Sequence, residues 1–458
     1  MDQGTTSSFS ADVGVKQGCP LSPVLFGIFI EACVPFFLAE AESLDAPDIL
    51  GTIIPLLLYA DDTSLCSFSE VGLQKSFEIL SAFCDFSGMS VNVDKRKTVV
   101  FRNSKTAVSP CILYRGEQLE VVDEFRYLGI VFHAYKGFEY TLQLISQSAS
   151  KKFYMLWATC REKGVCDTKT LLMLFRTLLF SILSYCCEVF SPYLCTVKDN
   201  DNPAELLQRR MFRCISGVCT TTPSILLLLE FGRRPVSIVW FQRATKYYTT
   251  LLSYPESSIL YKACQYNGLG SWRDHLRQFA SRLGGDSRLL GDFSLEKRNK
   301  LWVEVEDSFL KRMVSSLKEG LGSRLPLSKP LLKKYFSLIS SSPCVEPQAH
   351  LLHFKEWGTR SCASALRLNG IYKGINVWEK PFFTMAIFSK QKTLFLDKCP
   401  HCDHKQFSYE HSFSCTGFKH LRDRFSILRS FFDNMALPSL DFIHFIQAVH
   451  RSIAFKVQ

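Results

Sequence analysis

The stretch Pro55–Cys66, which reads PLLLYADDTSLC, constrains the fold of this chain more than any other. Two β-prone runs, Leu56–Tyr59 and Thr63–Ser67, flank the tripeptide Ala60–Asp62. This pattern predicts an antiparallel hairpin whose tight turn carries both aspartates. Two carboxylates in one turn repel each other, and a divalent cation beside them removes that repulsion; hard oxygen ligands favour Mg²⁺ or Mn²⁺. The alternative is an ordinary solvated Asp-Asp turn.

Helices are predicted on both sides of this hairpin. In the upstream segment GVKQGCPLSPVLFGIFIEA, Ser22 followed by Pro23 is typical of a helix N-terminus, and we expect a helix over Ser22–Glu40. Downstream, apolar residues recur with helical spacing over Ser69–Ser87. Gly18 has no side chain, so a substrate can approach the backbone there closely.

Composition indicates a folded chain with a polyanionic partner. The 458 residues are 47% hydrophobic and 21% charged, which suits two to four folded domains. The net charge of +11 fits either nucleic acid or acidic lipid. We find no transmembrane segment and no signal peptide, and the 18 cysteines suit reduced, buried positions. We therefore expect an intracellular protein, nuclear or cytoplasmic and not secreted, without a membrane partner.

Four ordered blocks, QGCPLSP, YADD, SGMSVNVDK and YLG, resemble the palm domain of reverse transcriptases of non-LTR (LINE-type) retrotransposons. The resemblance implies an RNA-directed DNA polymerase that uses two-metal nucleotidyl transfer, with RNA template, DNA primer and dNTPs as partners. It makes Asp61 and Asp62 the catalytic ligands of Mg²⁺ or Mn²⁺. Lys95 matches a catalytic lysine that neutralises the departing pyrophosphate, although an ordinary solvated lysine is an alternative. The residues implied to contact template, nucleotide or primer are Gln17, Gly18, Tyr59, Tyr127, Leu128 and Gly129.

A further carboxylate of the family's metal site has no match in this sequence. In the family an aspartate upstream of the QG block bridges both ions, but only 16 residues precede Gln17 here. Neither Asp2 nor Asp12 lies in a matching context. We therefore expect an N-terminally truncated retrotransposon protein that is inactive as an isolated chain.

Other functions remain open from the sequence. One alternative is a non-catalytic RNA-binding relic or domesticated fragment of a transposable element. Another is a group II intron or related bacterial reverse transcriptase, which the C-terminal cysteine and histidine pattern described below argues against.

The chain from Tyr140 to about Leu252 has a mainly helical pattern. One helix carries Gln208, Arg209, Arg210 and Arg213, a set of side chains that can follow a phosphate backbone or form a plain solvated face. This region resembles the thumb that follows the palm in LINE proteins. The resemblance implies that Arg209 and Arg210 contact the template and primer.

A zinc site is predicted near the C-terminus. The segment CPHCDHKQFSYEHSFSC places Cys399, Cys402, His411 and Cys415 at a spacing that can enclose one tetrahedral ion. It also resembles the C-terminal CCHC knuckle of LINE proteins. His401 and His404 are competing ligands. The alternative is an amphipathic helix from about Tyr409 whose cysteines pack inward.

Together these patterns predict an α+β fold. We expect a partial palm over residues 1–135, made of an antiparallel hairpin plus helices, and a helical thumb over 136–252. A mainly helical linker region would occupy 253–395, the zinc knuckle 396–420 and a helical tail 421–458.

Overall fold

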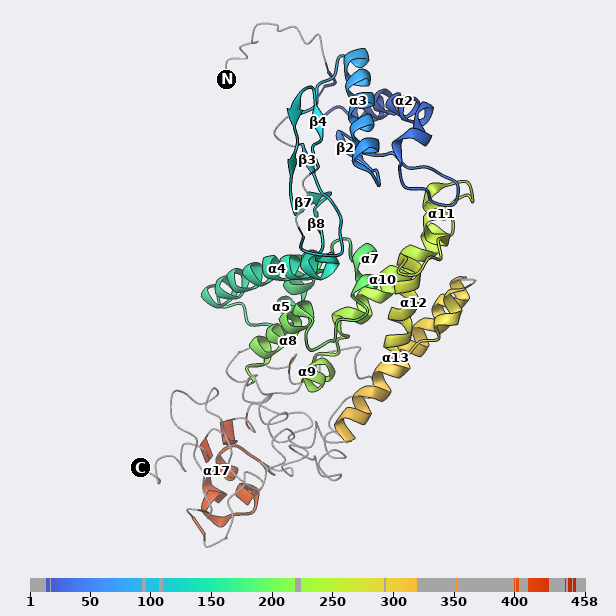
Figure 1. Ribbon diagram of the computed structural model, residues 1–458. Helices are drawn as coiled ribbons and strands as arrows, with labels where there is room; N and C mark the ends of the chain where they lie inside the picture. Colours follow the sequence, from blue (N-terminus) through green and yellow to red (C-terminus); the bar gives the residue numbers. More distant parts are fainter. Residues whose placement is uncertain are drawn as a thin grey trace, which may run out of the picture. The chain divides into compact units, whose positions relative to one another are not determined.

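Figure 1 shows the computed structural model of the chain. The chain forms two compact units. The first comprises Met1–Gly137 with Leu251–Asn267, and the second Phe138–Thr250 with Gly268–Gln458. The boundary at Gly137 is close to the predicted end of the palm, but residues 253–267 join the first unit rather than the predicted linker region. The structure describes residues 14–16, 18–92, 96–106, 110–218, 224–291, 294–318, 351, 399, 401–402, 411–427, 441, 444–446 and 448–449.

In the first unit, two helices replace the single helix predicted over Ser22–Glu40. They are α1 (Ser22–Glu31) and α2 (Cys33–Ala39), followed by a 3-10 turn at Ala41–Leu44. Pro35 lies near the start of α2 and has no N–H to donate to Glu31, so a continuous helix would lose a hydrogen bond there. The predicted single helix is therefore corrected: α1 ends at Glu31, about one turn before Pro35.

The helix α3 (Glu70–Ser87) has the predicted bounds because its ends carry strong local signals. The Ser69 side chain caps the N-terminus by accepting a hydrogen bond from the Gly72 amide. Gly88 ends the helix with a φ of 71°, a left-handed conformation that suits glycine. Gly72 lies so close to the preceding 3-10 turn that a Cβ there would be 2.1 Å from the Leu44 carbonyl oxygen.

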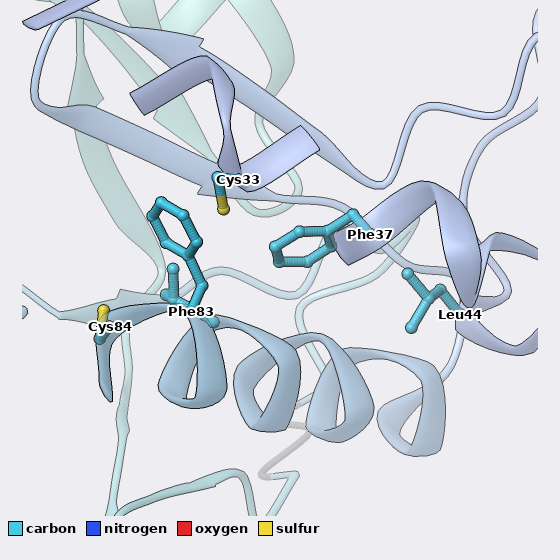
Figure 2. Close-up of a cluster of buried hydrophobic side chains, with 6 residues drawn as sticks. Cys33, Phe37, Leu44, Phe83 and Cys84 are labelled. Atoms are coloured by element: carbon cyan, nitrogen blue, oxygen red, sulfur yellow. The ribbon is translucent and has the colours of Figure 1, made fainter. Parts of the chain in front are cut away.

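The hairpin consists of β1 (Leu56–Tyr59) and β2 (Asp62–Leu65), paired antiparallel with Tyr59 opposite Asp62. It packs on a hydrophobic core contributed by α2, α3 and the 3-10 turn, against which Leu56 and Leu65 are partly buried. In Figure 2, Phe37 and Phe83 point into the space between these helices. The predicted hairpin and its packing on both flanking segments are therefore confirmed. The core residues are Cys33, Phe37, Leu44, Leu80, Phe83 and Cys84.

The remaining strands of the first unit form short two-stranded pairs. They are β3 (Lys97–Thr98) with β6 (Glu120–Val121), β4 (Leu113–Tyr114) with β5 (Glu117–Gln118), and β7 (Glu124–Tyr127) with β8 (Ile130–His133). Only the β3–β6 pair is parallel. The helix α11 (Ile259–Gln265) also belongs to this unit, where its Lys262 ammonium donates to the Thr52 hydroxyl at 2.6 Å.

Helices form the second unit, and its described residues contain no strand. They surround a core that includes Phe190, Phe212, Phe231, Trp240 and Tyr248. No disulfide joins the described cysteines of the chain. In the described parts of this range, 140–218 and 224–252, the predicted mainly helical character is confirmed. The helices are α4 (Gly137–Glu162), α5 (Thr168–Leu174), a π-helical turn (Phe175–Leu179), α6 (Phe180–Leu183), α7 (Cys187–Phe190), α8 (Pro203–Ser216), α9 (Ser224–Phe231), α10 (Val236–Leu251), α12 (Trp272–Leu283) and α13 (Leu295–Lys318).

Contrary to our expectation from the sequence, one described helical stretch is long and apolar enough to span a bilayer by length and composition, and a bent pair of helices is a second if the pair is taken as one span. One is Ser22–Ala39, with a mean hydropathy of 1.9 and 17% of its residues buried. The other is the bent pair Thr168–Leu183 with Cys187–Leu194. Segments that do not span a membrane can meet the same criteria of length and composition, so one or two such stretches carry no membrane assignment.

A buried carboxyl group joins two helices of the second unit. Glu205 on α8 is fully buried, and its Oε1 accepts a hydrogen bond of 2.8 Å from the Ser237 amide at the start of α10. Its Oε2 has no hydrogen-bond partner. Burial is the main reason that the Glu205 pKa rises to about 7, and the nearby Asp199 raises it further. Arg209 acts in the opposite direction, while Arg282 pairs with Asp199 at 2.6 Å.

We expect the second unit to lose stability as pH rises because of Glu205. A carboxyl group with a pKa of about 7 when folded and about 4.5 when unfolded binds more protons in the native state between those values. Its contribution of about 3 kcal/mol is fully present below pH 4.5 and is lost as pH rises through 7. Urea titrations at pH 5 and pH 8 should show a fall in stability that Glu205→Gln removes. The exposed control Glu162→Gln should retain the fall in the free energy of unfolding between pH 5 and pH 8. If this free energy falls equally in both variants, Glu205 is not the group responsible.

Candidate active site and metal centre

The two adjacent aspartates lie at the exposed tip of the β1–β2 hairpin. Ala60 and Asp61 form a two-residue turn, and Ala60 has a φ of 52°, a left-handed conformation that costs a non-glycine residue about 1–2 kcal/mol. Asp61 and Asp62 are both exposed, and the neighbouring Tyr59 side chain is 62% exposed. The strained turn therefore presents two carboxylates and an aromatic ring at one accessible end of the hairpin.

The donor chemistry of this pair fits Mg²⁺ or Mn²⁺. Magnesium sites commonly use one or two carboxylates and complete the coordination shell with waters and substrate phosphates. Asp61 and Asp62 supply hard oxygen donors that remain accessible to a substrate. Among the described residues no third metal-ligating side chain joins them, since the only such group of three or more lies near the C-terminus. Two carboxylates alone are too few ligands for a complete coordination shell.

The YLG block forms a second tight hairpin. Leu128 has a φ of 47° and Gly129 a φ of 83°, so the turn between β7 and β8 has two left-handed residues, as in a type I′ turn. Gly18 also has a positive φ, 82°, and a Cβ there would meet no atom within 4 Å. Its backbone is therefore open to approach, as predicted. Gln17 and Lys95 lie outside the described residues.

The structure buries two of the four side chains predicted to form a polar, basic face on α8. Arg209 is only 7% exposed, and its guanidinium donates to the Asn200 side-chain oxygen at 3.0 Å. Gln208 is also buried and donates to the Arg234 carbonyl at 3.1 Å. Arg210 is exposed, donates to the Tyr154 hydroxyl, and lies over the Tyr154 ring. Only Arg210 of the two predicted arginines is accessible to a phosphate.

The four predicted zinc ligands lie together. Their ligand atoms are all within 4.8 Å of one another. The Sγ atoms of Cys399 and Cys415 are 3.7 Å apart, and Cys402 Sγ is 3.8 Å from Cys415 Sγ. Tetrahedral Zn–S bonds of about 2.3 Å require S···S separations of roughly 3.8 Å. His411 directs Nε2 to within 3.2 Å of Cys402 Sγ. Both the donor set and the spacing fit Zn²⁺.

Neighbouring residues hold this group in place. Arg422 donates to the carbonyl oxygens of Ser412 at 2.5 Å and Cys415 at 2.7 Å, which fixes the segment between two ligands. Burial raises the pKa of the Cys399 thiol to about 11, and a bound cation would stabilise its thiolate. Arg422 could not be predicted from the sequence. Its hydrogen bonds go to backbone oxygens, and any residue type supplies these, so they leave no pattern of residues.

The competing interpretations of this region are resolved in part. The His401 ring packs against Phe418 with centroids 4.5 Å apart, and it is not among the four clustered ligands. His404 lies outside the described residues. Residues 411–418 form two short 3-10 turns, and the helix α17 begins only at Lys419. The described part of the segment is therefore not the amphipathic helix considered from the sequence.

Comparison with known proteins identifies the first unit. Residues 1–132 match the family model described as "Reverse transcriptase (RNA-dependent DNA polymerase)". The chain is 29% identical over 215 residues to the "Retrovirus-related Pol polyprotein from type-1 retrotransposable element R2" of Popillia japonica, a match that covers 44% of this chain and 27% of that protein. It is 29% identical over 141 residues to the corresponding polyprotein from type-2 element R2DM of Drosophila melanogaster, covering 29% of this chain and 13% of that protein. No solved structure matches the chain.

These matches and the hairpin geometry define the N-terminal part of the chain as a reverse transcriptase domain. It is a domain of the non-LTR retrotransposon class, similar to those of R2 elements. The resemblance noted in the sequence is thereby confirmed. The matched stretch spans about a quarter or less of the two polyproteins named above.

Proposed function

We propose that this chain contributes the Asp61–Asp62 part of an RNA-directed DNA polymerase site, which extends a DNA primer on an RNA template. The observation that carries the proposal is the pair of exposed carboxylates on a strained hairpin tip inside a reverse transcriptase domain. This placement suits a reaction in which polar groups must reach a substrate rather than a buried core.

The residues have distinct roles in this proposal. Asp61 and Asp62 bind the divalent ions, and the exposed Tyr59 ring lies against the primer end. The bound ions supply stabilisation of the charge that develops on the transferring phosphoryl group. Gln17, Gly18 and the hairpin residues Tyr127, Leu128 and Gly129 position template, nucleotide and primer, and Lys95 neutralises the pyrophosphate.

The C-terminal group has a separate proposed role. Cys399, Cys402, His411 and Cys415 bind one structural Zn²⁺, and the ordered knuckle contacts nucleic acid. The basic residues of α17, among them Lys419 and Arg424, support this because they give the knuckle a positive surface. Such a protein acts inside the cell, in the nucleus or cytoplasm.

A second candidate function is RNA binding without catalysis. It is favoured by the lack, among the described residues, of a third acidic ligand beside Asp61 and Asp62. Two-metal catalysis needs enough negative charge to hold both ions in place. A chain with two carboxylates alone would bind nucleic acid but leave the ions poorly held.

Primer extension tests the proposal and separates the two functions. We expect the purified 458-residue chain to show no extension with Mg²⁺ or Mn²⁺ above background, because two carboxylates do not hold two ions. A chimaera in which residues 1–132 replace the matching stretch of the Popillia japonica polyprotein should extend a DNA primer on RNA. A folded but inactive chimaera would overturn the polymerase assignment. Robust extension by the isolated chain would instead require a further ligand within it.

A further inference from the structure

The helix α1 of the first unit has an apolar face that the described part of the chain leaves exposed. Ile30 lies on the opposite side of the helix, where it packs against the hydrophobic core shared with α2 and α3. The side chains of the exposed face are three, four and seven positions apart, which places them along one side of a helix. Thus α1 has two apolar sides, and only one of them is buried. The exposed face consists of five large side chains that are between 44% and 65% exposed, Leu21, Val24, Leu25, Ile28 and Phe29.

Charges of opposite sign lie at the two ends of this apolar face. Lys16 precedes the helix and Glu31 is its last residue, and no charged residue lies between them. Both are exposed, and neither forms an ion pair with any residue that the structure describes. A carboxylate at the C-terminus of a helix is unfavourable to the dipole of that helix, but it is favourable at the N-terminus of another. An antiparallel partner helix of the same sequence would therefore place both charges well.

The exposed face is also complementary to itself in this antiparallel arrangement. A two-fold axis between Val24 and Leu25 brings each of these two residues opposite the other in the second copy. The same axis brings Leu21 of one copy opposite Ile28 of the other. It also carries Glu31 to the N-terminal end of the second helix, near Lys16 of that copy. One surface thus matches itself in apolar side chains and in charge.

A lipid bilayer is a less suitable partner for this face. The 10 residues of α1 extend about 15 Å, half the thickness of a hydrocarbon core of about 30 Å. The following helix, α2, is held in the protein core by Cys33 and Phe37 and cannot continue the span without disrupting that core. Helices that lie in a membrane interface commonly carry lysine or arginine on the polar side. The helix α1 contains neither and ends in Glu31.

We propose that two copies of this chain associate through the exposed face of α1, with the two helices antiparallel about a two-fold axis. Five half-exposed side chains provide less than the roughly 800 Å² that each partner buries in a stable complex of standard size. The dimer should therefore be reversible, with a Kd of about 10 µM. This association goes beyond the proposed polymerase function and does not depend on catalysis at Asp61 and Asp62.

Sedimentation velocity of the full chain, free of nucleic acid, tests the proposal. Between about 1 and 100 µM the mass should rise from that of a monomer to that of a dimer. Ile28→Glu should weaken association about 30-fold, because it places an unpaired carboxylate in the apolar contact of each copy. Ile28 is 65% exposed and does not belong to the core, so this variant should keep its far-UV circular dichroism spectrum. The control Val71→Glu, at an exposed apolar position on α3, should associate like the unchanged chain.

Charge reversal tests the antiparallel arrangement. Lys16→Glu and Glu31→Lys should each weaken association about fivefold, because like charges then meet at both ends of the helix pair. An equimolar mixture of these two variants should form a mixed dimer as tight as that of the unchanged chain, since opposite charges again meet. In a parallel pair like charges already face each other, so neither single variant would weaken association.

Several results would overturn the proposal. These are a chain that remains monomeric up to about 100 µM, an Ile28→Glu variant that associates normally, and charge variants that have no effect or do not recover when mixed. Vesicles of phosphatidylcholine should not bind the chain, and vesicle binding that Ile28→Glu abolishes would assign the face to a membrane instead. Because the measured quantity is mass, failure of the polymerase chimaera would leave this inference unaffected.

Discussion

Replacing Asp61 by Asn should lower primer extension by the Popillia japonica chimaera about 10³-fold, a loss of about 4 kcal/mol in transition-state stabilisation. Asparagine preserves the shape of the side chain but removes the negative charge that binds a divalent ion. Because Asp61 is exposed on the hairpin turn and packs against no core residue, the substitution should leave folding unchanged. The measurement is the initial rate of nucleotide incorporation at saturating Mg²⁺.

A matched control separates loss of a metal ligand from a general loss of negative charge. Glu78 is an exposed acid on α3 of the same unit, and Glu78→Gln should retain the full rate. Raising the concentration of Mn²⁺ should recover part of the activity of Asp61→Asn, since weaker binding can be offset by more ion. An Asp61→Asn chimaera with an unchanged rate would remove Asp61 from the metal site.

Local signals explain why much of the first unit could be predicted from the sequence. The bounds of α3 follow from a serine cap and a terminal glycine, and the hairpin follows from two β-prone runs around a short polar turn. Each of these signals acts within a few residues. They do not depend on how distant parts of the chain pack.

The errors arose where more distant or competing effects decide the outcome. Pro35 interrupts the predicted helix over Ser22–Glu40, although the apolar pattern continues through it. Arg209 has the sequence context of a surface residue but is buried against Asn200, which belongs to the loop before α8. The helical periodicity of α8 could not show that the loop before this helix would cover Arg209.

At the zinc site, too, the sequence predicted the local feature, the four ligands, but not the contact made by a residue outside the ligand pattern. Ligand spacing along the chain predicted which four side chains meet, because short loops restrict where the second pair of ligands can lie. The two hydrogen bonds from Arg422 come from a helix beyond the last ligand and involve only backbone oxygens. Such a contact leaves no pattern in the sequence.

We expect the full chain to bind one zinc ion at the C-terminal group, and Cys402→Ser to weaken this binding by about 10³-fold. The physical reason is the loss of one of four ligands in a site whose local fold depends on the metal. Zinc affinity should be measured by competition with a chromogenic chelator, and Co²⁺ substitution should give the absorption bands of a tetrahedral thiolate site. The exposed Cys111 lies outside the group, so Cys111→Ser should bind zinc normally.

Arg422 provides a second, more stringent comparison at the same site. With three thiolates and one neutral imidazole, a bound Zn²⁺ would leave one net negative charge, which the Arg422 guanidinium helps to balance while it holds the Ser412 and Cys415 carbonyls. Arg422→Met should therefore weaken zinc binding about tenfold, as expected for a residue that orients ligands. Arg424→Met, at an exposed position on the same helix, should not. If Cys402→Ser and Arg422→Met both bind zinc like the unchanged chain, the four residues are ordinary packing groups and the proposed zinc-dependent contact with nucleic acid is excluded.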